Sequence, residues 1–328
     1  MVEEVEGVGE LLEELRQKAF DPYQAFTVAE VFNMREEELK EFVGENGHFS
    51  TMFDFSAHLL TGGEHGWYDA KPVKFSEWKK TVIESQLEVQ NVGFLANIIE
   101  NHDEPRGAST YLPEYAVNPR GIKMLAAVNI LLRGLPFLYQ GQEIGMENLT
   151  FTSIDQVDDI SSIDEYHVAL DAGCTEKEAL ACVSRYSRDN ARTPVQWDTT
   201  ENAGFSKGTP WLPVNPNYKD INVEAQVNDP DSLFSFYKAL IALRKDPEYK
   251  ETIVYGELIP YLEEQHNLMS YYRKGDKTLL VLGNFQKEPQ SAVLPSAYKK
   301  VLLNNYPEVS VSGNTVTLDN YQVLILEL

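Results

Sequence analysis

The side chains best suited to chemistry follow a short apolar run. The run from Phe94 to Ile99 is apolar except for one residue, and the segment behind it supplies carboxylate, imidazole and guanidinium groups: Glu100, Asn101, His102, Asp103 and Arg106. An apolar run of this length suits a strand covered on both faces, as in a parallel sheet, and Pro105 prevents a helix there. Two interpretations fit this segment by itself, namely a strand that delivers charged groups to a site and a strand that ends in a polar turn.

A second candidate lies near the start of the chain. Ala25 to Val31 is predicted to be a short strand, and it carries one carboxylate, Glu30, among apolar and β-branched neighbours. A carboxyl group in such surroundings would be poorly solvated, which suits a general acid that must hold its proton near neutral pH.

Composition narrows the classes of partner. The 328 residues are 43% hydrophobic, enough for a sizeable core, and 28 Lys and Arg against 51 Asp and Glu give a formal net charge of −23. This charge disfavours nucleic acid and anionic membranes and favours a neutral substrate. No apolar run approaches the ~20 residues that span a bilayer, and the acidic start is unlike a signal peptide, so we expect a cytoplasmic protein. Cys174 and Cys182 have no zinc or redox spacing.

Strands alternate with helices in the first part of the chain. Periodicity predicts strands at 25–31, 48–55, 94–99 and 136–139 and helices at 2–19, 35–42, 75–89, 121–132, 166–185 and 232–244. Polar residues gather just after each strand, as at the active face of a β/α barrel. The segment 147–230 lacks clean alternation and is too long for a plain connection. Two interpretations fit its aromatic residues: they form a carbohydrate-facing wall, or they pack beneath the loop. These residues are Phe205, Trp211 and Tyr218.

The character of the chain changes at about residue 246. Short apolar runs punctuated by Gly, Asn, Asp and Pro follow, which predicts an antiparallel sandwich. The runs are 253–256, 268–273, 278–285, 291–294, 300–304, 315–318 and 322–328. We therefore expect two domains, residues 1–246 and 247–328.

Four motifs together resemble the α-amylase superfamily of glycoside hydrolases, especially its oligo-1,6-glucosidase and trehalose-6-phosphate hydrolase branch. They are Thr27-Val28-Ala29-Glu30-Val31, Glu100-Asn101-His102-Asp103-Glu104-Pro105-Arg106, Tyr139-Gln140-Gly141-Gln142-Glu143-Ile144-Gly145-Met146 and Ala191-Arg192-Thr193-Pro194-Val195-Gln196-Trp197-Asp198. The resemblance implies an α/β fold. It comprises strands five to eight of a TIM-type β/α barrel followed by the antiparallel β domain, in place of the complete barrel that length alone would suggest.

The resemblance also implies roles for individual residues. Glu30 is similar to the general acid/base of the family, and Asp103 to the carboxylate that stabilises the oxocarbenium-like transition state. His102 and Arg192 resemble residues that bind the terminal glucose, and a buried ion-pair partner is the alternative for Arg192. Arg106 resembles a residue of the substrate site that holds the carboxylates in place, and a buried ion-pair partner is the equal alternative.

The nucleophile of the family has no counterpart in these residues. It should lie in a Gly-x-Arg-x-Asp motif on strand four, and no such motif occurs in the 328 residues. The chain is therefore expected to be part of a retaining α-glucosidase acting on α-linked gluco-oligosaccharides, and to be inactive by itself. A carbohydrate-binding or partner-regulating module without catalysis is the alternative. No cofactor or metal is expected, because the calcium-site loop of the family would lie in the missing half. Association with itself or with a complementary half through open barrel edges is expected.

Overall fold

The first structural layer is a small parallel sheet. The structure is a computed structural model that describes residues 7–32 and 38–328. A sheet of four strands in the order β1-β2-β3-β4 is formed by Val28–Ala29, Thr51–Phe53, Leu95–Asn97 and Leu135–Pro136. Every neighbouring pair is parallel, with Ala29 beside Met52 and Phe53 beside Ala96. The four predicted strands are thus present, each shorter than expected, and together they form part of a β/α barrel.

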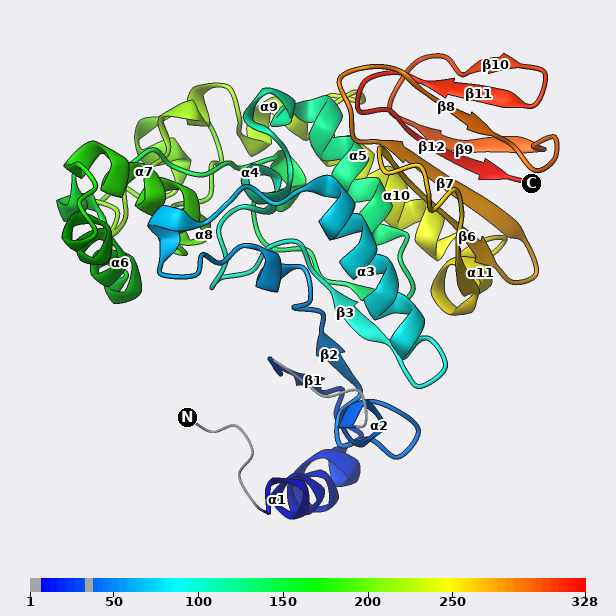
Figure 1. The fold of residues 1–328 in the computed structure, drawn as a ribbon, viewed down its shortest axis with the longest axis horizontal. Helices are drawn as coiled ribbons and strands as arrows, with labels where there is room; N and C mark the ends of the chain where they lie inside the picture. Colours follow the sequence, from blue (N-terminus) through cyan, green and yellow to red (C-terminus); the bar gives the residue numbers. More distant parts are fainter. Residues whose placement is uncertain (1–6, 33–37) are drawn as a thin grey trace.

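The helices α2 to α5 connect the strands of this sheet, and the later helices follow β4 toward the sandwich (Figure 1). Their bounds are α1 Val8–Leu15, α2 Leu39–Phe42, α3 Phe75–Val89, α4 Gly107–Tyr111, α5 Pro119–Ile130, α6 Ile160–Asp171, α7 Glu176–Tyr186, α8 Asp189–Arg192, α9 Val223–Gln226, α10 Leu233–Lys245 and α11 Lys250–Tyr255. Side-chain caps explain several starts, since Asn118 accepts from the Arg120 and Gly121 amides and Ser232 accepts from Ser235.

Two predicted elements differ in the structure. The single helix expected at 166–185 is a pair, α6 and α7, because Gly173 takes a left-handed φ of 93° and Thr175 caps the second helix. The predicted strand at 253–256 is wrong, because this apolar stretch ends α11 and buries Ile253 in the main core. The predicted helices at 2–19 and 35–42 extend into residues 1–6 and 33–37, which lie outside the described residues.

The C-terminal part is a β sandwich. A sheet of five strands has the order β5-β6-β7-β12-β9 and a second sheet the order β10-β11-β8. Their bounds are β5 Glu257–Pro260, β6 Leu268–Lys274, β7 Thr278–Asn284, β8 Gln290–Val293, β9 Lys300–Asn304, β10 Ser310–Ser312, β11 Thr315–Leu318 and β12 Val323–Glu327. All pairings in these sheets are antiparallel. The predicted sandwich is confirmed, and β5 and β10 are strands that the sequence pattern did not predict.

One hydrophobic core joins the helices to the five-stranded sheet. The rings of Phe75 on α3 and Phe285 after β7 stack at 3.9 Å, and the Tyr271 hydroxyl donates to the Val128 carbonyl on α5 at 2.7 Å. In Figure 1, α5 and α10 lie beside the antiparallel strands, while α6 and α7 form a separate pair at the far side. The sandwich therefore supports the helical layer that carries the loops after β3 and β4. No helix among the described residues has the length and apolar character needed to cross a membrane.

Candidate functional site

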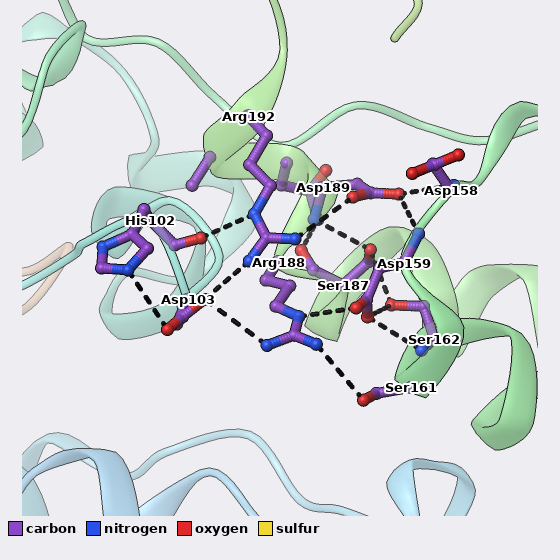
Figure 2. Close-up of polar contacts among 12 residues, drawn as sticks. His102, Asp103, Asp158, Asp159, Ser161, Ser162, Ser187, Arg188, Asp189 and Arg192 are labelled. Carbon is purple, nitrogen blue, oxygen red and sulfur yellow. Dashed lines mark hydrogen bonds and ion pairs between the residues drawn. The ribbon is translucent and has the colours of Figure 1, made fainter. Parts of the chain in front are cut away.

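Asp103 is the centre of a charged cluster in the loop after β3 (Figure 2). Its Oδ1 accepts from Arg192 Nη2 at 2.6 Å and lies 3.4 Å from Arg188 Nη1, while its Oδ2 lies 3.3 Å from His102 Nε2. The Asp103 amide donates to Asn101 Oδ1 at 2.7 Å, which fixes the turn. With 38% of its side chain exposed, Asp103 is held in a defined orientation and is still open to a ligand.

Arg192 connects the Asp103 loop to α8. Besides the contact with Asp103, its Nε donates to the His102 carbonyl oxygen at 2.9 Å. The guanidinium therefore grips both the carboxylate and the backbone of one loop, a two-point geometry that a lysine cannot reproduce. The structure thus brings Asp103, His102 and Arg192 together as the sequence analysis expected, and their roles toward substrate stay predictions.

Arg188 was not among the predicted site residues, yet it contacts Asp103. Its Nε donates to Asp159 Oδ1 at 2.6 Å, and that carboxylate also caps α6 by accepting from the Ser162 amide at 2.9 Å. The hydrogen bond to Asp159 raises the pKa of Arg188 above its ordinary value. Burial acts to raise the pKa of Asp159, but hydrogen bonds from Ser162 and Arg188 outweigh it and leave that pKa lowered. The only signal in the sequence was the position of Arg188 four residues before Arg192, one helical turn away.

Asp189 is a second residue that the sequence analysis missed. It is fully buried, and its Oδ2 accepts from the amides of Asp158 and Asp159 at 2.8 and 3.0 Å. Its Oδ1 lies 4.0 Å from Arg192 Nη1. Asp189 therefore ties the start of α6 to α8, so that the segment after β4 holds both arginines against Asp103.

Arg106 does not lie on the surface of the cluster, which corrects its assignment as a substrate-binding residue. Its side chain is 0% exposed. It donates to Glu100 Oε1 at 2.9 Å and to the Gln140 carbonyl at 2.7 Å. Glu100 also accepts from the Gly107 amide at 2.7 Å. Burial raises the pKa of Glu100, and the facing Arg106 opposes that shift. Of the two interpretations, the buried ion-pair partner is the one that the structure shows.

Glu30 follows β1 directly, at the carboxyl end of the sheet. The parallel order places β1 two strands from β3, about 10 Å across the sheet. Its side chain is exposed, so the apolar enclosure expected for Glu30 is absent. The physical reason is that β1 is the edge strand of the described sheet and has a neighbour on one side only. Glu30 and the Asp103 loop thus lie at the same carboxyl end of the sheet, and the side chain of Glu30 is exposed there.

Glu104 extends the contacts of the same loop toward β2. Its Oε2 lies 2.5 Å from His58 Nδ1, in the turn that follows β2. Nearby, Phe32 stacks on Phe55 with ring centroids 4.2 Å apart. These contacts join the loops after β1, β2 and β3 at the carboxyl end of the sheet, where the loops that follow parallel strands all lie.

The long segment after β4 leaves large aromatic side chains in solvent. Phe205, Trp211 and Trp197 are exposed. Exposure is compatible with the predicted carbohydrate-facing wall and argues against the alternative that Phe205 and Trp211 pack beneath the loop. Within residues 7–32 and 38–328 no group of three or more His, Cys, Asp or Glu side chains is arranged to hold a metal ion.

Two family models match the chain. The first is the alpha amylase catalytic domain, over residues 4–256, and the second is the alpha-amylase SusG C-terminal domain, over residues 268–325. The first match ends just after α11 and the second begins at β6, so that β5 lies between them.

Curated relatives agree with these models. The oligo-1,6-glucosidase of Bacillus cereus is 35% identical over 324 residues, which cover 97% of this chain and 58% of the relative. The trehalose-6-phosphate hydrolase of Bacillus subtilis (strain 168) is 33% identical over 332 residues, covering 98% of this chain and 58% of the relative. The chain thus spans less than two thirds of the length of these relatives.

Solved structures share the fold. The trehalose-6-phosphate hydrolase of Bacillus licheniformis superposes with a TM-score of 0.89 at 34% identity, covering 98% of this chain and 59% of that chain. The trehalulose synthase MutB from Pseudomonas mesoacidophila MX-45 gives 0.90 at 30% identity, covering 99% and 59%. Because a hydrolase and a synthase match equally well, the fold by itself does not select a reaction.

Proposed function

Since the chain belongs to the α-amylase family of glycoside hydrolases, we propose that it carries part of the active site of a retaining α-glucosidase. The proposed substrates are α-linked gluco-oligosaccharides. The observation that carries the proposal is the Asp103 cluster, in which a half-exposed carboxylate is oriented by Arg192 at 2.6 Å beside His102. Such a group can accept hydrogen bonds from sugar hydroxyls, which strengthen as positive charge develops on the ring.

Within this proposal each residue has a separate task. Glu30 is the general acid/base that protonates the leaving oxygen, and Asp103 stabilises the oxocarbenium-like transition state. His102 and Arg192 hold the terminal glucose. Arg106 acts below the surface by fixing Glu100 and the start of α4. The reaction needs carboxylates and a positioned sugar, so no metal or cofactor enters it.

We further propose that these 328 residues do not hydrolyse glycosides by themselves. Double displacement requires a second carboxylate ~5–5.5 Å from the acid, and the Gly-x-Arg-x-Asp motif is absent from the sequence. The test is an assay of the 328-residue protein with 4-nitrophenyl α-glucoside and isomaltose. We expect no turnover above a heat-treated control. Turnover that disappears in Glu30→Gln would refute this proposal and would require another nucleophile.

A non-catalytic carbohydrate-binding module is the second candidate, favoured by the fact that Asp103, His102 and Arg192 are already assembled. It predicts binding of glucose by titration calorimetry that is lost in Asp103→Ala and Arg192→Ala. Lys250→Ala is a matched control, because this lysine is exposed and pairs with Glu251 on α11, away from the Asp103 cluster. Absence of glucose binding by the native chain would exclude both this module and a competent glucose subsite.

The edge strands of the parallel sheet support a proposal that the protein associates with another chain. β1 and β4 each have one strand neighbour in the described chain, and unpaired edge strands invite pairing with another chain. We propose that the 328-residue protein associates with itself or with a complementary β/α half through these edges. Light scattering should show a mass above 37.2 kDa that rises with concentration. A monomer at high concentration, with no binding to a complementary half, would refute this.

A further inference from the structure

A cavity lies away from the Asp103 cluster, between the helical layer and the β sandwich. It has a volume of about 690 Å³, within the range of roughly 300–1,000 Å³ that is usual for small-molecule sites. Its wall is formed by the segments 72–75, 109–117, 147–148 and 285–286 together with Arg185. None of these residues is among those labelled in Figure 2. The cavity is therefore a separate place for a ligand.

The floor of this cavity rests on packed aromatic rings. Phe75 at the start of α3 stacks on Phe285 with ring planes 13° apart, and Trp78 packs against the same Phe285 ring at 5.4 Å. Trp78 and Phe285 are buried in the core that joins the helices to β7. Because the two layers meet here through packed rings, the cavity is preformed and a ligand would not have to order it.

An exposed aromatic ring stands at the rim. Tyr115 lines the cavity and is 65% exposed. Its ring lies edge-on to Tyr321 at 6.3 Å, and the two hydroxyls are 3.4 Å apart, so the ring is supported from one side. Pro113 precedes it and restricts the backbone of the same wall. A supported ring with a free face offers apolar area to a ligand at little cost in conformational entropy.

Polar groups with free hydrogen-bonding capacity complete the wall. In the described part of the chain, the side chains of Gln286 and Glu114 and the guanidinium of Arg185 make no hydrogen bond, although Arg185 lies over the Tyr186 ring. Glu147 accepts one bond from Asn217 at 3.2 Å, and burial raises its pKa. The wall thus combines donors and acceptors beside the aromatic ring.

The chemistry of this wall selects a neutral polyol. Two carboxylates, Glu114 and Glu147, line the cavity against a single guanidinium, Arg185, so the negative charge of the wall disfavours an anionic ligand. A pyranose presents a flat C–H face to an aromatic ring and hydroxyls to amide, carboxylate and guanidinium groups. We propose that this cavity is a second, non-catalytic binding site for one or two pyranose units of a neutral oligosaccharide.

The site is in contact with the framework of the Asp103 region. Asn148, at the cavity wall, accepts from the Arg106 amide at 2.9 Å, and Arg106 holds Glu100. A saccharide chain bound in this cavity would be kept on the same molecule as the Asp103 cluster, which raises its effective concentration there. This proposal does not require the chain to catalyse a reaction.

The test is calorimetric titration of the 328-residue protein with maltotriose, using one variant for each site. Tyr115→Ala and Gln286→Ala should each weaken the affinity of the cavity for maltotriose about three- to tenfold. This is the loss typical of a stacked ring or a polar contact. Tyr115→Phe keeps the ring and should retain binding. Tyr23→Ala is the matched control, because Tyr23 is 80% exposed and lies outside the cavity.

Arg192→Ala separates this proposal from the function proposed for the Asp103 cluster. If both sites bind sugar, Arg192→Ala removes the binding at the Asp103 cluster and leaves the binding at the cavity, which depends on Tyr115. The proposed site would be overturned if Arg192→Ala abolished all maltotriose binding. It would also be overturned if Tyr115→Ala and Gln286→Ala left that binding unchanged. A proline-rich peptide that binds in place of maltotriose and depends on Tyr115 would overturn it as well. Circular dichroism of each variant confirms that the fold is intact.

Discussion

Removing Arg106 should expose the cost of a buried, uncompensated carboxylate. In Arg106→Met the carboxylate of Glu100, which is 3% exposed, loses its guanidinium partner at 2.9 Å and, among the described residues, keeps the Gly107 amide at 2.7 Å as its one hydrogen-bond donor. Breaking one side of such a pair typically costs about 3–5 kcal/mol of unfolding free energy. The carbonyl oxygens of Gln140 and Ala191 also lose a donor. We therefore expect a loss near the upper end of that range.

The pH dependence of the variant follows from the same contacts. Burial already raises the pKa of Glu100, and Arg106 is the charge that opposes the shift, so its removal raises the folded-state pKa further. Between the unfolded pKa of about 4.3 and the folded value, the folded chain binds more protons than the unfolded chain. The free energy of unfolding of Arg106→Met should therefore fall as pH rises, by up to about 1.4 kcal/mol per pH unit.

Urea denaturation followed by circular dichroism at pH 5 and pH 7 measures both effects. The matched controls are Glu100→Gln and the double variant Glu100→Gln with Arg106→Met, which lacks both charges. The double variant should lose at least about 2 kcal/mol less than the sum of the single variants and should lack the added pH slope. Additive losses, or an Arg106→Met variant that becomes more stable as pH rises, would refute the account of this pair.

Three other changes test the framework. Gly107→Ala should cost at least about 1 kcal/mol in thermal unfolding, because its Cβ would lie 2.4 Å from the Ile99 carbonyl oxygen; an unchanged melting temperature would contradict this. Burial raises the pKa of Tyr111, so stability should fall above pH ~10, where the unfolded chain loses the proton first, and Tyr111→Phe should reduce that slope by up to about 1.4 kcal/mol per pH unit. Lys79→Met removes hydrogen bonds to three carbonyls within 262–265 and should speed amide hydrogen exchange there and leave exchange in β12 unchanged.

The alternation of strands and helices could be predicted from the sequence, because it depends on short-range periodicity. The helix at 75–89 was predicted at its observed bounds, since its apolar positions recur at helical spacing. The strand predicted at 253–256 is wrong because short-range periodicity does not distinguish the two structures that such a run can form. An apolar, β-branched run suits either a strand or a buried helix, and only its packing in the main core selects α11.

The candidate site was predictable only where a residue type and its place after a strand were sufficient. Asp103, His102 and Arg192 met both conditions, and the structure assembles them. The contacts of Arg188 depend on α6 returning Asp159 to within 2.6 Å of its Nε, a relation across 29 residues that no local pattern contains.

Exposure was decided by tertiary structure alone. Arg106 is completely buried because α4 and the loops after β4 close over it, although its sequence context suited a surface arginine equally well. Glu30 is exposed because its strand lies at the edge of the sheet, despite apolar neighbours along the chain. The sequence by itself thus determined the order of elements and the chemical groups that follow them. Solvation and partners were set by chain segments distant in sequence, because burial depends on what packs from other elements.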